Sequence, residues 1–324
     1  MSNIAIHPYE NKIQKFISAI EKSEPDIVEA LLNDITLDPS VFSNYAIKHV
    51  AKTGDFQIIK LLLLDPRVDV SVNNNEPFRL ASRYGYVNIV RLLLKHNKVD
   101  PTTNDNEPIR LASRYGYVNI VSLLLKHNKV DPTTNNNEPL RLASQYGYTN
   151  IVRLLLKHSK VDPTINNNEP FRLASKYNHI DIVALLLKDN RINPAINNNE
   201  AIITAIYNNK IELTTLLLQD PRIDPGVKND IAFRSAAEFG YTELVKILLC
   251  DHRINPSANN NYAIKFAAGN GHIEIVKLLL NNPAVNPGVE DSAIIIRMAV
   301  TGGRYEVINF LMRYSMEHHE NWNA

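Results

Sequence analysis

The chain has 324 residues, a formal net charge of +1 and one cysteine, Cys250. Its hydrophobic fraction of 44% and charged fraction of 21% are ordinary for a soluble folded protein, so the composition suggests neither wholesale disorder nor a membrane protein. The near-neutral charge gives no whole-molecule attraction to nucleic acid or anionic lipid, and one cysteine excludes an intramolecular disulfide framework or a cysteine-built zinc site.

The beginning of the chain carries no export signal that we can identify. Residues 1–8 lack the basic flank and the apolar run of a signal peptide, and no segment reaches 18 apolar residues. We therefore expect a soluble intracellular protein.

A repeat of 31 residues runs through the sequence. It is marked by a glycine or, in some units, by an asparagine or serine at the same phase: Ser23, Gly54, Gly85, Gly116, Gly147, Asn178, Asn209, Gly240, Gly271 and, after one extra residue, Gly303. Ser23 belongs to a weaker first unit, whose residues 27–32 match residues 58–63. A fixed period of this length predicts an all-α solenoid of about ten stacked repeats.

One unit, residues 107–132, shows what each part of the repeat does. Pro108 suits the first turn of a short helix, and an apolar face begins at residues 109–112. Gly116 supplies the positive φ of a tight turn, and residues 120–125 form a second helix with a wide apolar stripe. A left-handed cap is expected at Asn128, and the asparagine run 135–137 is typical of a turn.

Because neither helix can bury its apolar side within one unit, each unit must stack on the next. Leu80, Leu111 and Leu142 are expected in the resulting core. We expect one solenoid over residues 1–324, with an N-terminal capping repeat at 1–35, central repeats at 36–291, a C-terminal capping repeat at 292–312 and a polar tail at 313–324.

The first helix of each unit carries the motif by which the chain resembles a known family. Residues 76–81 read Glu-Pro-Phe-Arg-Leu-Ala, and matching stretches begin at Glu107, Glu138 and Glu169. The units resemble ankyrin repeats, whose signature is Thr-Pro-Leu-His-x-Ala, with Glu in place of Thr and Arg in place of His. The resemblance covers roughly residues 16 to 312 and implies helix-turn-helix repeats with short β-turn fingers.

A narrower resemblance concerns the source of the chain. Its asparagine-rich fingers and the run Asn-Tyr-Ala-Ile-Lys, at residues 44–48 and again at 261–265, are similar to ankyrin proteins of giant amoebal viruses of the mimivirus-like kind. For a viral protein, the intracellular location expected above is the host cytoplasm.

The resemblance also implies where a partner binds. In ankyrin proteins the partner lies along the concave groove formed by the finger tips and the ends of the first helices. The matching positions here are Arg83, Tyr84, Arg114, Tyr115, Gln145, Tyr146, Lys176, Tyr177 and Tyr207, with the finger residues Asn74, Asp105, Asn136 and Asn167. Since Tyr and Arg are enriched at binding hot spots, we expect a protein partner with an acidic or mixed surface and a monomeric chain.

A second row of cations stands where ankyrin repeats carry histidine: Lys48, Arg79, Arg110, Arg141, Arg172, Arg234, Lys265 and Arg297. Glu76 precedes Arg79 by three residues, as Glu107 precedes Arg110. Residues three apart on a helix are neighbours, so this row is expected to form ion pairs within each repeat.

No enzymatic activity, cofactor or metal is expected. The sequence shows no nucleophile elbow, phosphate loop or paired catalytic carboxylates. His96, His127 and His158 recur in phase, but stacked helices lie about 9 Å apart, which is too far for shared zinc ligands, so a helix-capping role is expected. The tail residues 317–320, Glu-His-His-Glu, are a weak alternative for metal binding.

The sequence therefore predicts a protein-interaction scaffold, and the resemblance to viral proteins implies a viral factor that engages a host protein. Two alternatives stay open. One is a nucleic-acid-binding solenoid, in which Arg83, Arg114 and Lys176 contact phosphates while tyrosines stack on bases. The other is a structural subunit of a virion.

Overall fold

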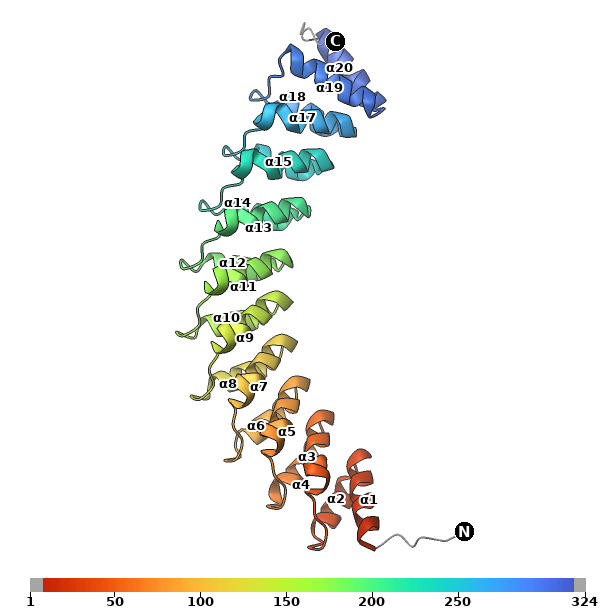
Figure 1. Cartoon of the computed structure of the whole chain (residues 1–324), viewed down its shortest axis with the longest axis vertical. Helices are drawn as coiled ribbons and strands as arrows, with labels where there is room; N and C mark the ends of the chain where they lie inside the picture. The colour runs from red at the N-terminus through yellow and green to blue at the C-terminus, as the bar shows by residue number, and fades with distance from the viewer. Residues whose placement is uncertain (1–7, 318–324) are drawn as a thin grey trace, which may run out of the picture. The chain divides into compact units, whose positions relative to one another are not determined.

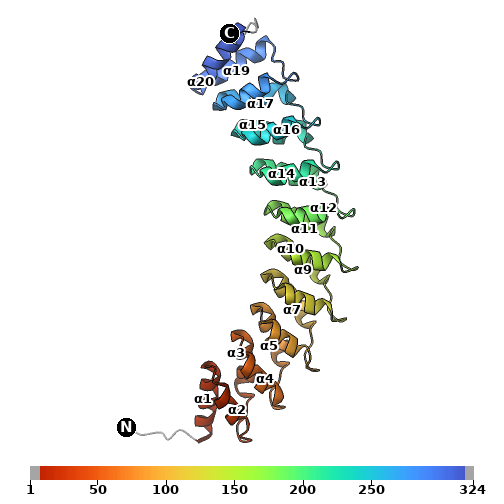
Figure 2. The ribbon, with the colours of Figure 1, turned by 180° about the vertical axis from the view of Figure 1, so that it is seen from behind.

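The computed structural model describes residues 8–317, and every regular element in that range is a helix. The chain divides into two compact units, Met1–Ile165 and Asn166–Ala324. Each contains successive pairs of antiparallel helices, stacked one on the next (Figures 1 and 2). The all-α class and the ten helix pairs expected from the 31-residue period are confirmed over the described residues.

The first helices of the pairs are α1 (Pro8–Glu21), α3 (Val41–Thr53), α5 (Val72–Tyr84), α7 (Thr103–Tyr115), α9 (Thr134–Tyr146), α11 (Ile165–Lys176), α13 (Ile196–Tyr207), α15 (Val227–Phe239), α17 (Ala258–Asn270) and α19 (Val289–Thr301). The second helices are α2 (Pro25–Leu32), α4 (Phe56–Leu64), α6 (Val87–Leu93), α8 (Val118–Leu125), α10 (Thr149–Leu156), α12 (Ile180–Leu187), α14 (Ile211–Leu218), α16 (Thr242–Leu249), α18 (Ile273–Leu280) and α20 (Tyr305–Glu317).

Each first helix from α3 to α17 begins with a left-handed turn of three residues, at the end of its finger. In α5 the left-handed residues are Asn73, Asn74 and Asn75, with φ of 53°, 56° and 56°. The Asn75 N–H donates to the Ser71 carbonyl at 3.0 Å, four residues back. Asparagine tolerates this region better than other residues with a Cβ, so the asparagine runs have a direct conformational cause. The right-handed helix begins only after this turn, with Pro77 in its first turn, as expected.

The turn between the helices of a pair also requires positive φ. Gly54 has φ of +89°, and a Cβ added there would lie 2.4 Å from the Tyr86 ring of the next repeat. Glycine is therefore needed at Gly54 for its backbone and for its lack of a side chain. Ser23, Asn178 and Asn209, which occupy this position in other repeats, also have positive φ. The turn therefore recurs at the same position in these units, although they lack the glycine.

The core lies between the helix pairs and is continuous from repeat to repeat within each unit. Phe78, Ile89, Val90 and Leu93 are at most 1% exposed, and their equivalents in other repeats are buried in the same way. The expectation for Leu80, Leu111 and Leu142 is wrong, because all three are only half-buried. The first helix turns its Phe78 and Ala81 side into the core, and Leu80 falls at its margin.

The second helices end without the left-handed cap expected at Asn128. The cap residue of α8, Lys126, is right-handed, and Asn128 does not have positive φ. Short turns close the helix end instead: the His127 N–H donates to Leu124 and the Val130 N–H donates to His127. These i to i−3 bonds satisfy the terminal carbonyls that a left-handed cap would otherwise satisfy.

Candidate functional site

An exposed row of tyrosines follows the ends of the first helices in the first unit. Tyr84, Tyr115 and Tyr146 are 39%, 38% and 42% exposed. The Arg83 guanidinium lies 6.0 Å from the Tyr84 ring centre, and that of Arg114 lies 5.9 Å from the Tyr115 ring. Both distances are within cation–π range, so each repeat presents its cation and its aromatic ring as one group. We call residues 83–84 and their equivalents 114–115, 145–146 and 176–177 the Tyr/Arg ladder.

A second set of tyrosines contacts the rings of the ladder. The sequence analysis did not identify this set. Tyr84 stacks on Tyr86 with ring centres 6.4 Å apart, and Tyr115 and Tyr146 contact Tyr117 and Tyr148 at 6.3 and 6.4 Å. These supporting rings are half-buried. The signal was present in the sequence, because an aromatic residue follows the turn glycine in each of these units.

The second unit has the same kind of cation and aromatic pair at Lys176 and Tyr177, and changes after it. The Lys176 ammonium lies 5.7 Å from the Tyr177 ring, and Tyr177 stacks on His179. Tyr207 is 38% exposed and contacts Phe239 of the next repeat edge-on at 6.2 Å. Beyond Tyr177 the ladder therefore becomes aromatic without its paired cation.

The three finger residues have three different environments. The first one is tied to its own helix, because the Asn73 amide donates to Glu76 at 2.9 Å. The third, Asn75, is 7% exposed and accepts from the Asp100 N–H of the next repeat at 3.0 Å. In this finger Asn73 and the middle residue, Asn74, are both exposed. The expected binding residues Asn74, Asp105, Asn136 and Asn167 are all middle residues and all exposed.

The second row of cations, which we call the inner cation row, begins with Lys48, Arg79 and Arg110. It forms ion pairs, but the expected pairing within a repeat is wrong. Lys48 pairs with Glu76 at 3.7 Å, Arg79 with Glu107 at 2.8 Å, and Arg110 with Glu138 at 3.4 Å. Each pair therefore joins a first helix to the next one. Stacking brings the carboxylate of the following repeat within reach of the cation, so these three pairs join neighbouring repeats.

Glu107 shows how these pairs hold their charge. Burial by itself would raise the pKa of its carboxyl, but hydrogen bonds from Arg79 and Asn104 outweigh burial and lower that pKa below its usual value. Glu107 is thus ionised at neutral pH, and the pair with Arg79 is maintained.

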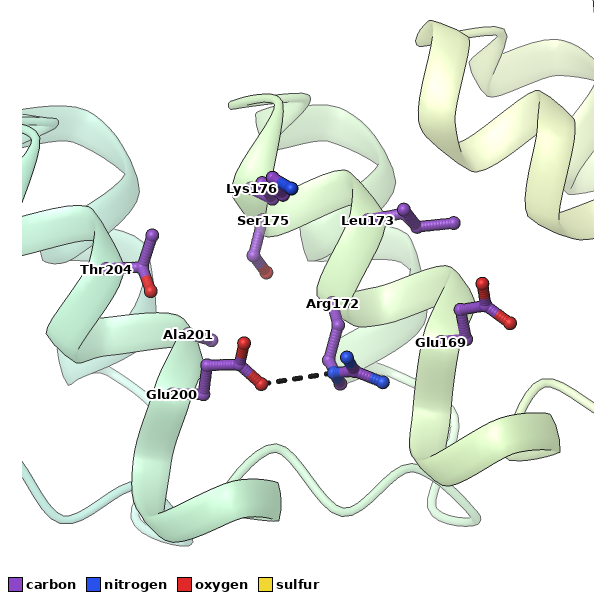
Figure 3. A pocket seen from close by; sticks show the side chains of 8 residues that line it. All are labelled: Glu169, Arg172, Leu173, Ser175, Lys176, Glu200, Ala201 and Thr204. Atoms are coloured by element: carbon purple, nitrogen blue, oxygen red, sulfur yellow. Dashed lines mark hydrogen bonds and ion pairs between the residues drawn. The ribbon is translucent and has the colours of Figure 1, made fainter.

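A pocket of about 280 Å³ lies between α11 and α13, beside the ladder residue Lys176 (Figure 3). Its floor is crossed by the ion pair between Arg172 and Glu200, at 3.1 Å. Ala201 and Thr204 line the far wall, where the preceding repeat has Pro170 and Leu173. These two smaller side chains provide the space that the pocket occupies.

The recurring histidines lie at the ends of the second helices and act as acceptors. The Nδ1 atoms of His96, His127 and His158 face the N–H groups two residues on, at 3.3 to 3.4 Å. Among residues 8–317 no three His, Cys, Asp or Glu side chains are grouped as metal ligands. His318, His319 and Glu320 of the tail lie outside the described residues. Within the described range no helix is long and apolar enough to span a bilayer.

Comparison with protein families gives one match, described as ankyrin repeats (3 copies), over residues 16–105, 97–167 and 233–321. These segments cover well over half of the chain. Between them, residues 168–232 contain most of α11, all of α12 to α14 and the beginning of α15. Comparison with curated proteins gives no match.

Proposed function

Because this chain belongs to the ankyrin repeat family, we propose that it is a non-catalytic scaffold that holds a protein partner on the face carrying the Tyr/Arg ladder. Ankyrin repeats are generally protein-interaction modules. The observation that supports this surface most strongly is the regular pairing of an exposed tyrosine with a cation, at Arg83 with Tyr84 and again at Arg114 with Tyr115.

The supporting rings make this surface suitable for binding. Ring contacts with Tyr86 and Tyr117 restrict Tyr84 and Tyr115 before a partner arrives. Less side-chain freedom is then lost on association, and more of the contact energy appears as affinity. The cations beside the rings favour a partner surface that is acidic or mixed.

The pocket beside Lys176 extends the proposal to an anchoring point. Its size suits one side chain of a partner, and central pockets filled by a single side chain are typical of hot spots. Thr204→Leu introduces the residue that the preceding repeats have at this position, Leu173 and Leu142, and should fill the pocket without disturbing the fold. We expect it to weaken partner binding about tenfold.

We also propose that the chain is a giant-virus factor and that its partner is a host protein. The asparagine-rich fingers and the repeated Asn-Tyr-Ala-Ile-Lys run support this source. Affinity capture from the cytoplasm of amoebal cells, followed by mass spectrometry, identifies the partner. Capture of nucleic acid, or of other virion proteins alone, would favour the two alternative functions.

Once a partner is identified, the ladder is tested by replacing Arg83, Tyr84, Arg114, Tyr115 and Tyr146 with Ala. Two lost hot-spot residues cost more than about 2 kcal/mol each, so roughly a thousandfold loss of affinity is expected by titration calorimetry. The control replaces Lys95, Lys126 and Lys157, which are equally exposed but lie at the far ends of the second helices.

The control set should change affinity little, and circular dichroism should show native helix content for both variants. Loss of binding in the control set alone would place the partner on the other face of the repeats. A protein that binds nucleic acid through these residues would instead show a steep decline of affinity with salt.

A further inference from the structure

The ladder reverses its charge in the second unit. Glu238 stands two residues before the turn glycine, where other repeats have Arg83, Arg114 and Lys176. Aromatic residues of three consecutive repeats contact Glu238, its neighbour Phe239, or each other. We call Tyr207, Glu238, Phe239, Tyr241, Tyr262 and Phe266 the Glu238 cluster.

The contacts within the cluster form two sets, which meet at the adjacent residues Glu238 and Phe239. Tyr207 meets Phe239 edge-on at 6.2 Å, and Phe239 contacts Tyr241 at 5.7 Å. The Tyr262 hydroxyl donates to Oε2 of Glu238 at 2.9 Å, and Tyr262 stacks on Phe266 with ring centres 3.9 Å apart. Tyr207 and Phe239 are 38% and 48% exposed, so the cluster opens to solvent on the ladder face.

The carboxylate of Glu238 is held in place rather than free to swing. Its backbone carbonyl accepts from the Asn270 amide at 2.8 Å and lies 3.0 Å from Nε2 of His272. Its side chain is oriented by Tyr262, whose pKa is raised by burial and by the bond to Glu238. A half-buried carboxylate beside aromatic faces attracts a cation more strongly than an exposed one, because solvent screens it less.

The cation that lies nearest by sequence, Arg234, is already engaged. It donates to the Asn229 carbonyl of its own finger at 2.8 Å, and its guanidinium lies 4.8 Å from the Tyr262 ring. Arg234 is a member of the inner cation row. Other members of that row form ion pairs, whereas Arg234 makes a cation–π contact. It also shows that rings of this cluster accept a guanidinium.

We infer that the Glu238 cluster is a recognition site for an arginine side chain of the protein partner, stacked on Tyr207 and Phe239 and paired with the Glu238 carboxylate. Arginine fits better than lysine because its planar guanidinium stacks on aromatic faces while it donates to a carboxylate. The inference rests on the proposed function, and it gives the second unit a preference for a basic segment of that partner.

The site is tested on the full chain without the partner. N-acetyl-arginine methylamide is titrated into protein with 13C-labelled tyrosine and phenylalanine rings, and ring shifts are followed by NMR. We expect saturable shifts of Tyr207, Phe239 and Tyr262. The citrulline analogue has nearly the same shape but no charge, and it should bind at least tenfold more weakly.

Glu238→Gln is the decisive variant, because glutamine can still accept the Tyr262 hydrogen bond. About tenfold weaker arginine binding is expected. Glu243→Gln is the matched control, since Glu243 is exposed on α16 and pairs with Lys246. In the first unit, Tyr45 donates to Glu21 in the same way but its ring contacts His49, and its shifts provide an internal comparison.

Equal binding of arginine and citrulline would overturn the inference, because the cluster would then be an apolar surface only. Unchanged arginine affinity in Glu238→Gln would overturn it as well. Neither result depends on the partner. Failure of the ladder substitutions to affect partner binding would count against the proposed function and leave the arginine titration interpretable by itself.

Discussion

At the scale of single residues, asparagine is the residue type on which these repeats depend. Sequence reasoning identified the finger asparagines as turn formers, and the left-handed φ of Asn73, Asn74 and Asn75 confirms it. It did not predict that Asn75 is buried and bonded to the next repeat. Three identical letters carry no information about which one points inward, because that depends on the direction of the turn.

The first prediction separates the two roles of Asn75. Asn75→Gly keeps access to positive φ but removes the acceptor for the Asp100 N–H, which should cost about 1 kcal/mol of unfolding free energy. Asn75→Ala also introduces left-handed strain and should cost about 2 to 3 kcal/mol. Urea denaturation measures both. Asn74→Ala is the control, because it introduces the strain without removing the hydrogen bond between repeats. If Asn75→Gly left the unfolding free energy unchanged, the hydrogen bond from Asp100 would not stabilise the protein.

The second prediction concerns Asp230, which replaces asparagine at the buried finger position and is 5% exposed. Burial raises the pKa of its carboxyl, although the Asn255 N–H donates to it at 3.1 Å and partly offsets this. A raised folded-state pKa means that stability is present below the unfolded pKa of about 3.9 and is lost as pH rises through the folded value.

Asp230→Asn should therefore stabilise the protein at pH 7 by about 1 kcal/mol, since asparagine keeps the acceptor without a buried charge. Below about pH 4 the advantage should disappear. Thermal melts of both proteins from pH 3 to 7 follow the difference, and comparing the two cancels the opposite pH dependence of the other carboxylates. A constant difference across this range would contradict the assignment.

The ion pairs of the inner cation row show where spacing alone is ambiguous. Glu107 lies three residues before Arg110 and 28 residues after Arg79, and both arrangements bring charges near one another. The sequence predicted the structural role of the row. The choice between the two partners depends on the offset between neighbouring helices, which no single repeat encodes.

At the scale of elements, an arginine of the following repeat donates hydrogen bonds to the end of some second helices and not of others. Arg253 donates to the carbonyls of Ile223 and Leu218 in the preceding repeat, at 2.6 and 3.0 Å, while its own Asp251 pairs with it. Arg222 makes the same contacts to Ile192 and Leu187. The nearly identical repeats have Lys98, Lys129 and Lys160 at this position. A lysine cannot donate to two carbonyls and a carboxylate in one plane.

The third prediction removes and installs this contact. Arg253→Ala should cost about 1 kcal/mol, a value that allows for partial solvent exposure of the pair. The double change His127→Asp with Lys129→Arg reproduces the Asp-x-Arg arrangement in the first unit and should add a similar amount. Denaturant midpoints measure both, and Lys246→Ala, in an exposed pair with Glu243, should have almost no effect. A destabilised double variant would show that the arginine contact is not transferable.

At the scale of the whole molecule, the repeat period was the most informative feature of the sequence. It predicted the helix pairs, the turn positions and the exposed ladder, because each depends on contacts within a repeat or with its neighbour. The half-burial of Leu80 and the right-handed cap of α8 were not predicted. Both are set by where the adjacent repeat lies, which a pattern taken from one repeat does not specify.

The last prediction tests whether the repeats are energetically independent beyond their neighbours. Deleting residues 107–137 joins Asn106 to Glu138 and recreates the natural Asn-Glu-Pro junction, so every remaining repeat keeps its phase. In the rejoined chain Leu140 meets the face that contacted Ile109, and both positions are fully buried aliphatic residues of similar volume. The shortened protein should fold, with native helix content per residue and a smaller denaturant slope, because less surface is exposed on unfolding.

The control deletes only residues 107–134. This removes 28 residues and breaks the phase, which places polar finger residues against a helix face, so the control should unfold or aggregate. If both deletions unfolded, stability would depend on contacts beyond nearest neighbours, and the one-dimensional account of these repeats would be wrong.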